Sequence, residues 1–351
     1  MKNLKISEYK LGAGPMSIEI IDILINYSKA MTLPLMIIAS RNQVDHSSGY
    51  VTTTKELLTK NTHDNILFCR DHCGPYFSTA EKGMSIADAI RSTKDTIEQD
   101  ILHGMDLIHI DTCYCDDPYA AAEELIEFAT NLNPNIVLEF GSEENTGDLP
   151  ALQKFQNDAS FASQFKNIKF IVGQTGSLVM NGKQSGSFDV QYVQQLVSIA
   201  NKHGMRFKEH NADYLLPLDI RMRKESGVNA VNIAPQLGHI QTETILNLCT
   251  KFDIDAAQFR NTILQSNTWD KWITNKDCAD TTKIHTAGHY CFNTIEYADI
   301  KEALSKHINV DDEINAAITT CLNVYYSKET EEDMLKRKIA EIRKRDPFIY
   351  D

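Results

Sequence analysis

The 351-residue sequence has no long hydrophobic run, and this absence bears on where the protein resides. No stretch reaches the ~18 consecutive apolar residues that a membrane-spanning helix needs. The first residues, MKNLKISEYKLGAG, also lack the apolar segment and the small-residue cleavage site of a secretory leader. We therefore expect a protein of the cytoplasm that has no membrane partner.

Basic charge is also in short supply. The sequence has 35 Lys and Arg residues against 48 Asp and Glu residues, which gives a formal net charge of −13. A nucleic-acid partner would require a basic stripe that neutralises phosphates, so this composition argues against one. The one basic cluster, at 336–345, is interleaved with acidic residues and indicates a solvent-exposed helix with paired charges.

Cysteine is scarce, and its spacing is not that of a structural zinc site. Of the eight cysteines, Cys113 and Cys115 form a C-x-C that has no second pair at zinc-finger spacing. We expect reduced thiols and no disulfide framework. A G-x-G-x-x-G loop is missing too, since Pro15 follows Gly12-Ala13-Gly14 where such a loop would continue, and this argues against a dinucleotide site.

What the sequence does contain is a regular alternation of short apolar runs and helical patterns. Nearly every apolar run ends in Gly, Pro, Asn, Asp or His, as expected where a buried strand leaves a parallel sheet. We count eight such runs, which begin at residues 11, 35, 66, 107, 136, 170, 205 and 228. Eight strands that alternate with helices predict an α/β fold, a (β/α)8 TIM barrel, in preference to an open doubly wound sheet.

After about residue 240 the pattern becomes entirely helical. Candidate helices cover 241–252, 255–265, 299–306, 311–326 and 331–345. This stretch is longer than an eighth barrel helix needs. We therefore divide the chain into a barrel, residues 1–240, and a C-terminal helical extension, residues 241–351, that packs on one end of the barrel or forms an oligomer contact.

Polar residues stand at the ends of most predicted strands. Reactive side chains of (β/α)8 barrels lie at the carboxyl ends of the strands, so these positions form the candidate site. In chain order they are Arg41, Asn42, Gln43, Asp45, Asp71, His72, His109, Asp111, Glu139, Glu143, Glu144, Gln174, Thr175, Glu209, His210, Asn211, Asp213, Asn232 and Gln236.

Two histidines and one carboxylate of this set form the predicted metal site. His72, His210 and Glu143 would offer a divalent ion two imidazoles and a carboxylate that offsets its charge. Asp71, next to a ligand at a strand end, is suited to proton transfer. A carboxylate that only orients His72 fits the same position, and the spacing does not decide between these roles.

Five strings at the strand ends carry a family resemblance. They are Ala39-Ser40-Arg41-Asn42-Gln43-Val44-Asp45, Asp71-His72-Cys73-Gly74-Pro75, Ile108-His109-Ile110-Asp111, Gly141-Ser142-Glu143 and Glu209-His210-Asn211-Ala212-Asp213-Tyr214. In this order they resemble the barrel motifs of the Z-type subunit of tagatose-bisphosphate aldolase, over roughly residues 12–240. S-x-N-Q-V and D-H-x-G-P together make the likeness fairly specific.

That family is related to the class II, zinc-dependent ketose-bisphosphate aldolases, which are (β/α)8 barrels that form dimers or tetramers. The resemblance implies that Asp71 transfers a proton and that His72 and His210 bind Zn²⁺ or another divalent ion. The class II pattern has a third histidine at the place where Gln174 stands here. A glutamate, Glu143 or Glu139, is therefore expected as the third ligand.

The resemblance also implies a sugar or sugar phosphate as substrate, handled by aldol cleavage or condensation. Asn232 matches an asparagine that meets the substrate near its phosphate. Asp213 stands in a loop that class II aldolases build from glycine and serine, and its negative charge repels phosphate. The expected substrate contacts are Arg41, Asn42, Gln43, Asp111, Gln174, Asp213 and Asn232.

Two other functions fit the same residues. The Z-type subunit has often been regarded as a non-catalytic partner of a separate aldolase chain, so an accessory subunit that binds a second aldolase subunit is one alternative. A metal-dependent sugar isomerase or epimerase is the other, because it would stabilise the same enediolate and differ in the bond that breaks next. An aldolase that acts as a homo-oligomer is our first expectation.

Overall fold

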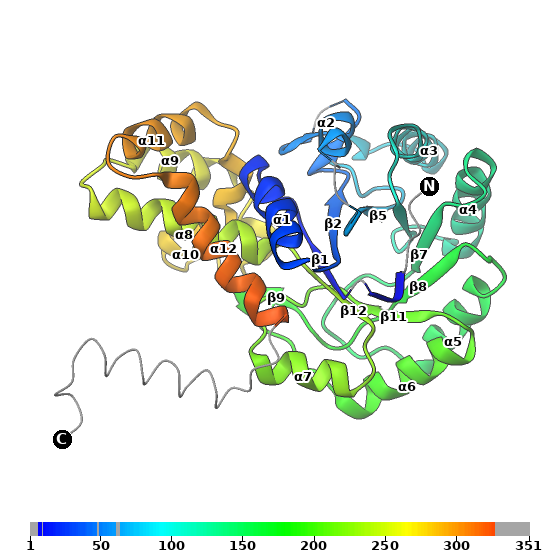
Figure 1. Cartoon of the computed structure of the whole chain (residues 1–351). Coiled ribbons are helices and arrows are strands. Elements are labelled where there is room, and N and C mark those ends of the chain that lie inside the picture. The colour runs from blue at the N-terminus through cyan, green and yellow to red at the C-terminus, as the bar shows by residue number, and fades with distance from the viewer. Residues whose placement is uncertain (1–5, 9, 48, 61–63, 327–351) are drawn as a thin grey trace, which may run out of the picture.

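The computed structural model describes residues 6–8, 10–47, 49–60 and 64–326, and it contains a closed parallel barrel (Figure 1). The strand order is β1-β12-β11-β8-β7-β6-β5-β2. These strands are β1 (Leu11–Ala13), β2 (Leu35–Ser40), β5 (Ile66–Cys73), β6 (Leu107–Asp111), β7 (Val137–Gly141), β8 (Ile168–Val172), β11 (Arg206–Glu209) and β12 (Ala230–Ile233). All eight predicted strands are present, so the predicted (β/α)8 barrel is confirmed.

Helices follow the barrel strands and surround them. They are α1 (Ile18–Met31), α2 (Thr54–Thr59), α3 (Ile86–His103), α4 (Pro118–Leu132), α5 (Leu152–Ala162), α6 (Val190–Lys202) and α7 (Pro217–Glu225). Side chains of Ser17, Ser85, Asp117 and Asp189 accept a backbone N–H of the first helical turn and so fix where α1, α3, α4 and α6 begin. Two short strand pairs decorate the loops, β3 (Val44–Asp45) with β4 (Thr52–Thr53) and β9 (Val179–Met180) with β10 (Lys183–Gln184).

Alternate residues of the strands fill the barrel interior with two layers of different chemistry. An apolar layer consists of Met36, Ile38, Leu67, Cys69, Leu107, Phe170 and Ala230, which form one buried cluster. Nearer the carboxyl ends of the strands, Lys208 donates to Glu139 over 2.7 Å, and both side chains are fully buried. The interior is therefore packed, and it becomes polar only where the strands end.

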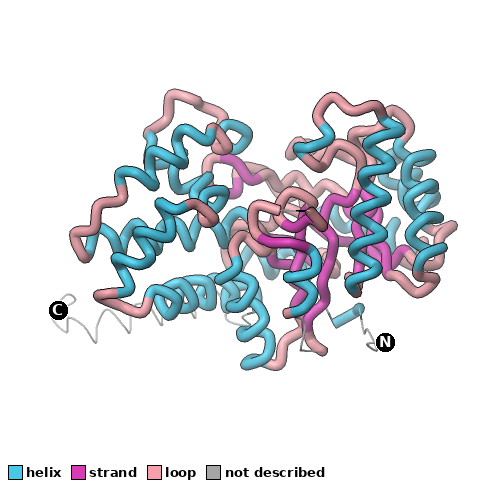
Figure 2. The backbone as a smooth tube through the Cα atoms, turned by 90° about the horizontal axis from the view of Figure 1, so that it is seen from above, coloured by secondary structure: helices cyan, strands magenta, loops and turns pink. Residues whose placement is uncertain are grey.

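The helical extension leaves the barrel and then returns to it. Figure 2 shows its helices as a lobe to one side of the barrel strands. They are α8 (Pro235–Lys251), α9 (Ala257–Ser266), α10 (Asp280–Ala287), α11 (Ile295–Ser305) and α12 (Val310–Tyr326). α12 packs against both α1 and α7, and Tyr27 of α1 donates to Asn323 over 2.9 Å. The extension thus places its last described helix in the ring around the barrel.

Four expectations from the sequence can be compared with the structure here. α8 runs through the domain boundary that we placed after residue 240. The predicted helix at 331–345 and the basic cluster at 336–345 lie outside the described residues. All eight cysteines are free thiols, as predicted. In the described part of the chain, no helix is both long enough and apolar enough to cross a membrane.

Arg70 is the largest of the fully buried side chains and ties β5 to α3. Its Nε and Nη2 donate to the two carboxylate oxygens of Asp100, each over 2.7 Å. Nη1 donates to the backbone carbonyls of Ala39 and Ser40, each over 3.1 Å. This bidentate pair and its added hydrogen bonds satisfy both buried charges.

We expect Arg70→Met to lower the free energy of unfolding by about 3–5 kcal/mol, because it leaves the Asp100 carboxylate buried without a counter-charge. Lys94→Met is the matched control, since it removes a more exposed partner of Glu124 and should cost less than about 1 kcal/mol. Urea denaturation followed by circular dichroism measures both values. Equal losses in the two variants would contradict the structural role of Arg70.

Candidate active site

A cavity of about 480 Å³ opens at the carboxyl ends of the barrel strands, where the predicted polar residues stand. Three parts of the chain line it. The strand ends and the loops after them provide most of the wall, and the β9–β10 hairpin provides another part. The helical extension contributes Lys271, Trp272 and Tyr290. Residues that are far apart in sequence therefore share one cavity.

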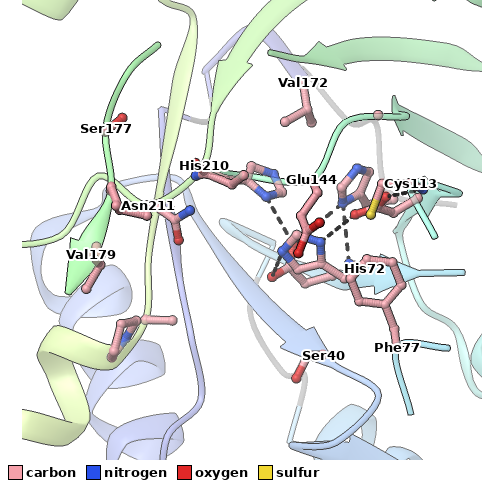
Figure 3. Close-up of a pocket in the computed structure, with 18 of the residues that line it drawn as sticks. Ser40, His72, Phe77, Cys113, Glu144, Val172, Ser177, Val179, His210 and Asn211 are labelled. Carbon is pink, nitrogen blue, oxygen red and sulfur yellow. Dashed lines mark hydrogen bonds and ion pairs between the residues drawn. The ribbon is translucent and has the colours of Figure 1, made fainter. Parts of the chain in front are cut away.

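Three histidines form the chemical centre of this cavity. His72 lies on β5, His109 lies on β6, and His210 directly follows β11. Each offers one ring nitrogen, and these three atoms lie within 4.8 Å of one another. Figure 3 shows the rings of His72 and His210 turned toward each other, and their centroids are 5.1 Å apart. Imidazoles gathered in this way fit a divalent ion such as Zn²⁺.

A β-bulge in β5 lets two consecutive residues face the cavity. Between Arg70 and Cys73 the strand advances three residues while its partner β6 advances two. In a regular strand, Asp71 and His72 would point to opposite faces. The extra residue and the left-handed backbone of His72, with φ 47°, allow both side chains to line the cavity.

Carboxylates orient two of the histidine rings. Nδ1 of His72 lies 2.6 Å from Oδ2 of Asp111, and Nε2 of His210 lies 2.8 Å from Oε1 of Glu139. The other ring nitrogen of each histidine faces Asp71, at 3.7 Å for His72 and 3.8 Å for His210. In metal sites, carboxylate partners of this kind fix the tautomer and the orientation of the ligands. This donor set, in which His109 and His210 are buried and His72 is partly exposed, thus fits a metal ion.

Asp71 lies among the three imidazoles. One of its carboxylate oxygens is also 3.8 Å from Nδ1 of His109. Burial by itself would raise the pKa of Asp71, but His72 and His210 nearby hold it well below its usual range. Its buried Oδ1 makes no hydrogen bond to any residue that the structure describes. An ionised carboxylate with a free acceptor atom therefore faces the point that the histidines share.

Glu143, the third predicted ligand, lines the cavity but is not part of the histidine group. Burial and the neighbouring Asp158 raise the pKa of Glu143 to about 7, although Lys154 opposes this shift. A carboxyl group with a pKa near neutrality is suited to proton transfer. The metal-ligand role of Glu143 stays a prediction, and His109 takes the third place in the group.

The alternation of residues along β6 indicates that His109 faces the barrel interior. Leu107, His109 and Asp111 are alternate residues of β6, so their side chains point to the same side of the strand. Leu107 belongs to the apolar layer inside the barrel, and His109 therefore points inward above it. Gly141 leaves space for the ring, since a Cβ at that position would lie 3.0 Å from Nε2 of His109.

The predicted substrate contacts divide into two groups. Those that line the cavity are Asn42, Gln43, Asp111 and Gln174. Arg41 is buried elsewhere, where it pairs with Glu81 over 2.7 Å and donates to the carbonyl of Gly74 over 2.9 Å. Its side chain supports the loop that follows β5, so of Arg41, Asn42 and Gln43 only the last two reach the cavity.

Asn232 and Asp213 are buried and do not line the cavity wall. The side-chain amide of Asn232 has no hydrogen-bond partner among the described residues. Gly12 makes room for it, since a Cβ there would lie only 2.2 Å from Oδ1 of Asn232. Oδ1 of Asp213 accepts the backbone N–H groups of Ala234 and Gln236, each over 2.9 Å, and so caps the start of α8.

Comparison with known proteins shows a shared fold at low sequence identity. No protein-family model and no curated protein matches the chain. A solved structure described as a probable tagatose 6-phosphate kinase from Sinorhizobium meliloti aligns over 90% of this chain and 99% of its own, with a TM-score of 0.76 and 17% identity. A fructose-bisphosphate aldolase from Campylobacter jejuni aligns over 92% of this chain and 91% of its own, with a TM-score of 0.53 and 10% identity.

Proposed function

We propose that this chain is a metal-dependent, class II aldolase-like enzyme that cleaves or forms a carbon–carbon bond of a ketose. The observation that carries the proposal is the position of Asp71 among His72, His109 and His210 at the carboxyl ends of the barrel strands. Three imidazoles suit Zn²⁺ or a related divalent ion. The names of the two structural neighbours add support, because fructose bisphosphate and tagatose 6-phosphate are both phosphorylated ketoses.

Different residues would bind the metal ion, orient its ligands and transfer the proton in a retro-aldol step. The three histidines would hold the ion, and Asp111 and Glu139 keep two of the rings oriented. A bound divalent ion would supply Lewis-acid polarisation of the ketose carbonyl and offset the negative charge that develops on the substrate. Asp71 accepts the proton of the hydroxyl group beside the bond that breaks, and the electron pair of that bond passes to the ketose carbonyl side as an enediolate. A proton from Asp71 or solvent then gives the ketone, and condensation runs the same transfers in reverse.

The proposed enzyme also has an expected substrate class, oligomeric state and location. We expect an anionic or phosphorylated sugar as substrate, a homo-oligomer as the active form and the cytoplasm as the location. The support for these expectations is the resemblance of the strand-end motifs to those of the Z-type and class II aldolases. As an accessory subunit, the chain would instead bind a second aldolase subunit.

An assay of the purified full-length chain with Zn²⁺ and a panel of ketose phosphates tests the proposal. We expect about one tightly bound ion per chain, and cleavage into a ketone and an aldehyde fragment that stops on chelation and resumes when metal is restored. A rearranged but uncleaved sugar would indicate an isomerase or epimerase. A metal-free chain that forms a complex with a separate aldolase would indicate an accessory subunit. Either result would overturn the proposal.

A further inference from the structure

The cavity is mainly acidic, and its cation comes from the helical extension. The acidic residues that line it are Asp71, Asp111, Glu143 and Glu144. Among the described lining residues, Lys271 is the only lysine or arginine. Its Nζ lies 5.2 Å from the ring centroid of Trp272 and 5.1 Å from that of Tyr290, and both rings also line the cavity. A positive charge is thus held at one position of an otherwise negative wall.

The N-terminus of α8 is a second position where an anion would be expected to bind, and the carboxylate of Asp213 already occupies it. Many (β/α)8 barrels bind phosphate at the loops after the seventh and eighth strands, together with the N-terminus of a helix. The corresponding strands here are β11 and β12, and α8 starts at the cavity, which Ala234 and Pro235 line. The N–H groups of Ala234 and Gln236 both point to the carboxylate of Asp213, which is only 1% exposed.

The charge of Asp213 works against a phosphate at the start of α8. A second anion would have to displace this carboxylate or lie beside it with little water to screen the repulsion. Burial raises the pKa of Asp213 to about 7, although its hydrogen bonds from Gln236 and Ala234 oppose that shift. Above that pH the Asp213 side chain is charged, and its negative charge offsets the partial positive charge at the N-terminus of α8.

We propose that the anionic group of the substrate binds Lys271 at the mouth of the cavity, and that Asp213 excludes anions from the start of α8. This inference rests on the proposed function, which places the ketose carbonyl at the histidines. Asp213 follows His210 in the same loop, so a phosphate on the carbon next to the carbonyl would approach Asp213. A phosphate at the far end of the sugar would extend toward Lys271 instead.

Calorimetric binding of fructose 6-phosphate and fructose 1-phosphate to the full-length, zinc-loaded protein tests this inference at a pH above that of Asp213 ionisation. We expect the 6-phosphate to bind about fivefold to tenfold more tightly, as one added charge-assisted contact would give. Lys271→Gln should weaken binding of the 6-phosphate alone and so reduce this difference, while the repulsion of the 1-phosphate by Asp213 and the affinity for unphosphorylated fructose stay unchanged. Asp213→Asn keeps an oxygen that accepts the two N–H groups but removes the charge, so it should strengthen binding of the 1-phosphate.

Lys251→Gln is the control for Lys271→Gln. Lys251 is the last residue of α8, its Nζ also lies over an aromatic ring, 5.1 Å from that of Phe252, and it does not line the cavity. This variant should leave both affinities unchanged. Tighter binding of the 1-phosphate by the unaltered protein, or an affinity for the 6-phosphate that is unchanged in Lys271→Gln, would overturn the inference.

The binding readout separates this inference from the proposed function. A protein that shows the Lys271-dependent preference but cleaves no ketose would contradict the proposed function and uphold the assignment of the anion position. An enzyme that cleaves ketoses but prefers the 1-phosphate would uphold the proposed function and contradict the assignment of the anion position. Because Lys271 is exposed, its replacement by glutamine leaves the buried core intact, which makes this variant the decisive one.

Discussion

Asp71→Asn is expected to lower kcat for aldol cleavage by about 10²–10⁴-fold while the bound metal remains. Asparagine keeps the shape of the side chain but cannot take up the hydroxyl proton. The ligand rings should stay in place, because His72 is held by Asp111 and His210 by Glu139. Steady-state kinetics together with elemental analysis of the same sample measure the two quantities.

Two outcomes would remove Asp71 from the chemical step. Full activity in Asp71→Asn would exclude it as the group that moves the proton. Loss of metal together with activity would make it a carboxylate that orients His72, the alternative that the sequence leaves open. Asp116→Asn is the matched control, since Asp116 is exposed in the loop after β6 and does not line the cavity. It should change neither quantity.

His109→Ala should weaken metal binding by more than about a hundredfold and abolish turnover. Loss of a residue that merely orients a ligand costs about 10–100-fold in metal affinity, so loss of a ligand should cost more. Competition with a chelating dye measures the affinity directly. Glu143→Gln is the informative comparison, because Glu143 lines the same cavity outside the histidine group.

The pair of variants decides which residue is the third ligand. We expect Glu143→Gln to keep its metal, since three imidazoles remain. If Glu143→Gln loses its metal and His109→Ala keeps it, the third ligand is Glu143, as the sequence predicts. His307→Ala provides the control, because His307 is exposed on the extension, is stacked on Phe252 and does not line the cavity.

The fold was predictable because most barrel strands are short apolar runs that end in a residue type that interrupts strands. A closed parallel sheet brings all these ends together, so the residues just after them could be gathered into one site without coordinates. This argument placed Asn42, Gln43 and Gln174 at the cavity, where the structure has them. The position of a residue after a strand end does not reveal whether its side chain points into the cavity or away from it.

Arg41 and His109 show where that argument fails. Arg41 directly precedes two lining residues, yet its guanidinium finds a buried partner, Glu81, 40 positions later in the sequence. His109 points inward because of the pleat of β6, whereas the polar residue that marks the strand end is Asp111, two positions later. The bulge that turns Asp71 and His72 to one side depends on the register with β6, which no local pattern in β5 reveals.

The contribution of the extension to the site was beyond local reasoning altogether. Lys271 lies in a short turn between α9 and α10, well after the last barrel strand. Only the tertiary packing of the extension brings it to the cavity. The two aromatic rings beside it belong to the extension, whereas the carboxylates that line the same cavity come from β5, β6 and the loop after β7.

The return of α12 to the barrel has a consequence for how the protein is made. β1 pairs with β12, and Tyr325 and Tyr326 line a cavity together with Leu11 and Val231 at this seam. A ribosome delivers the eight strands well before it delivers α12, so the seam stays without this helix until the extension has been synthesised. We therefore expect chains that terminate before residue 310 to expose the apolar residues of this seam and to aggregate more readily than the full chain.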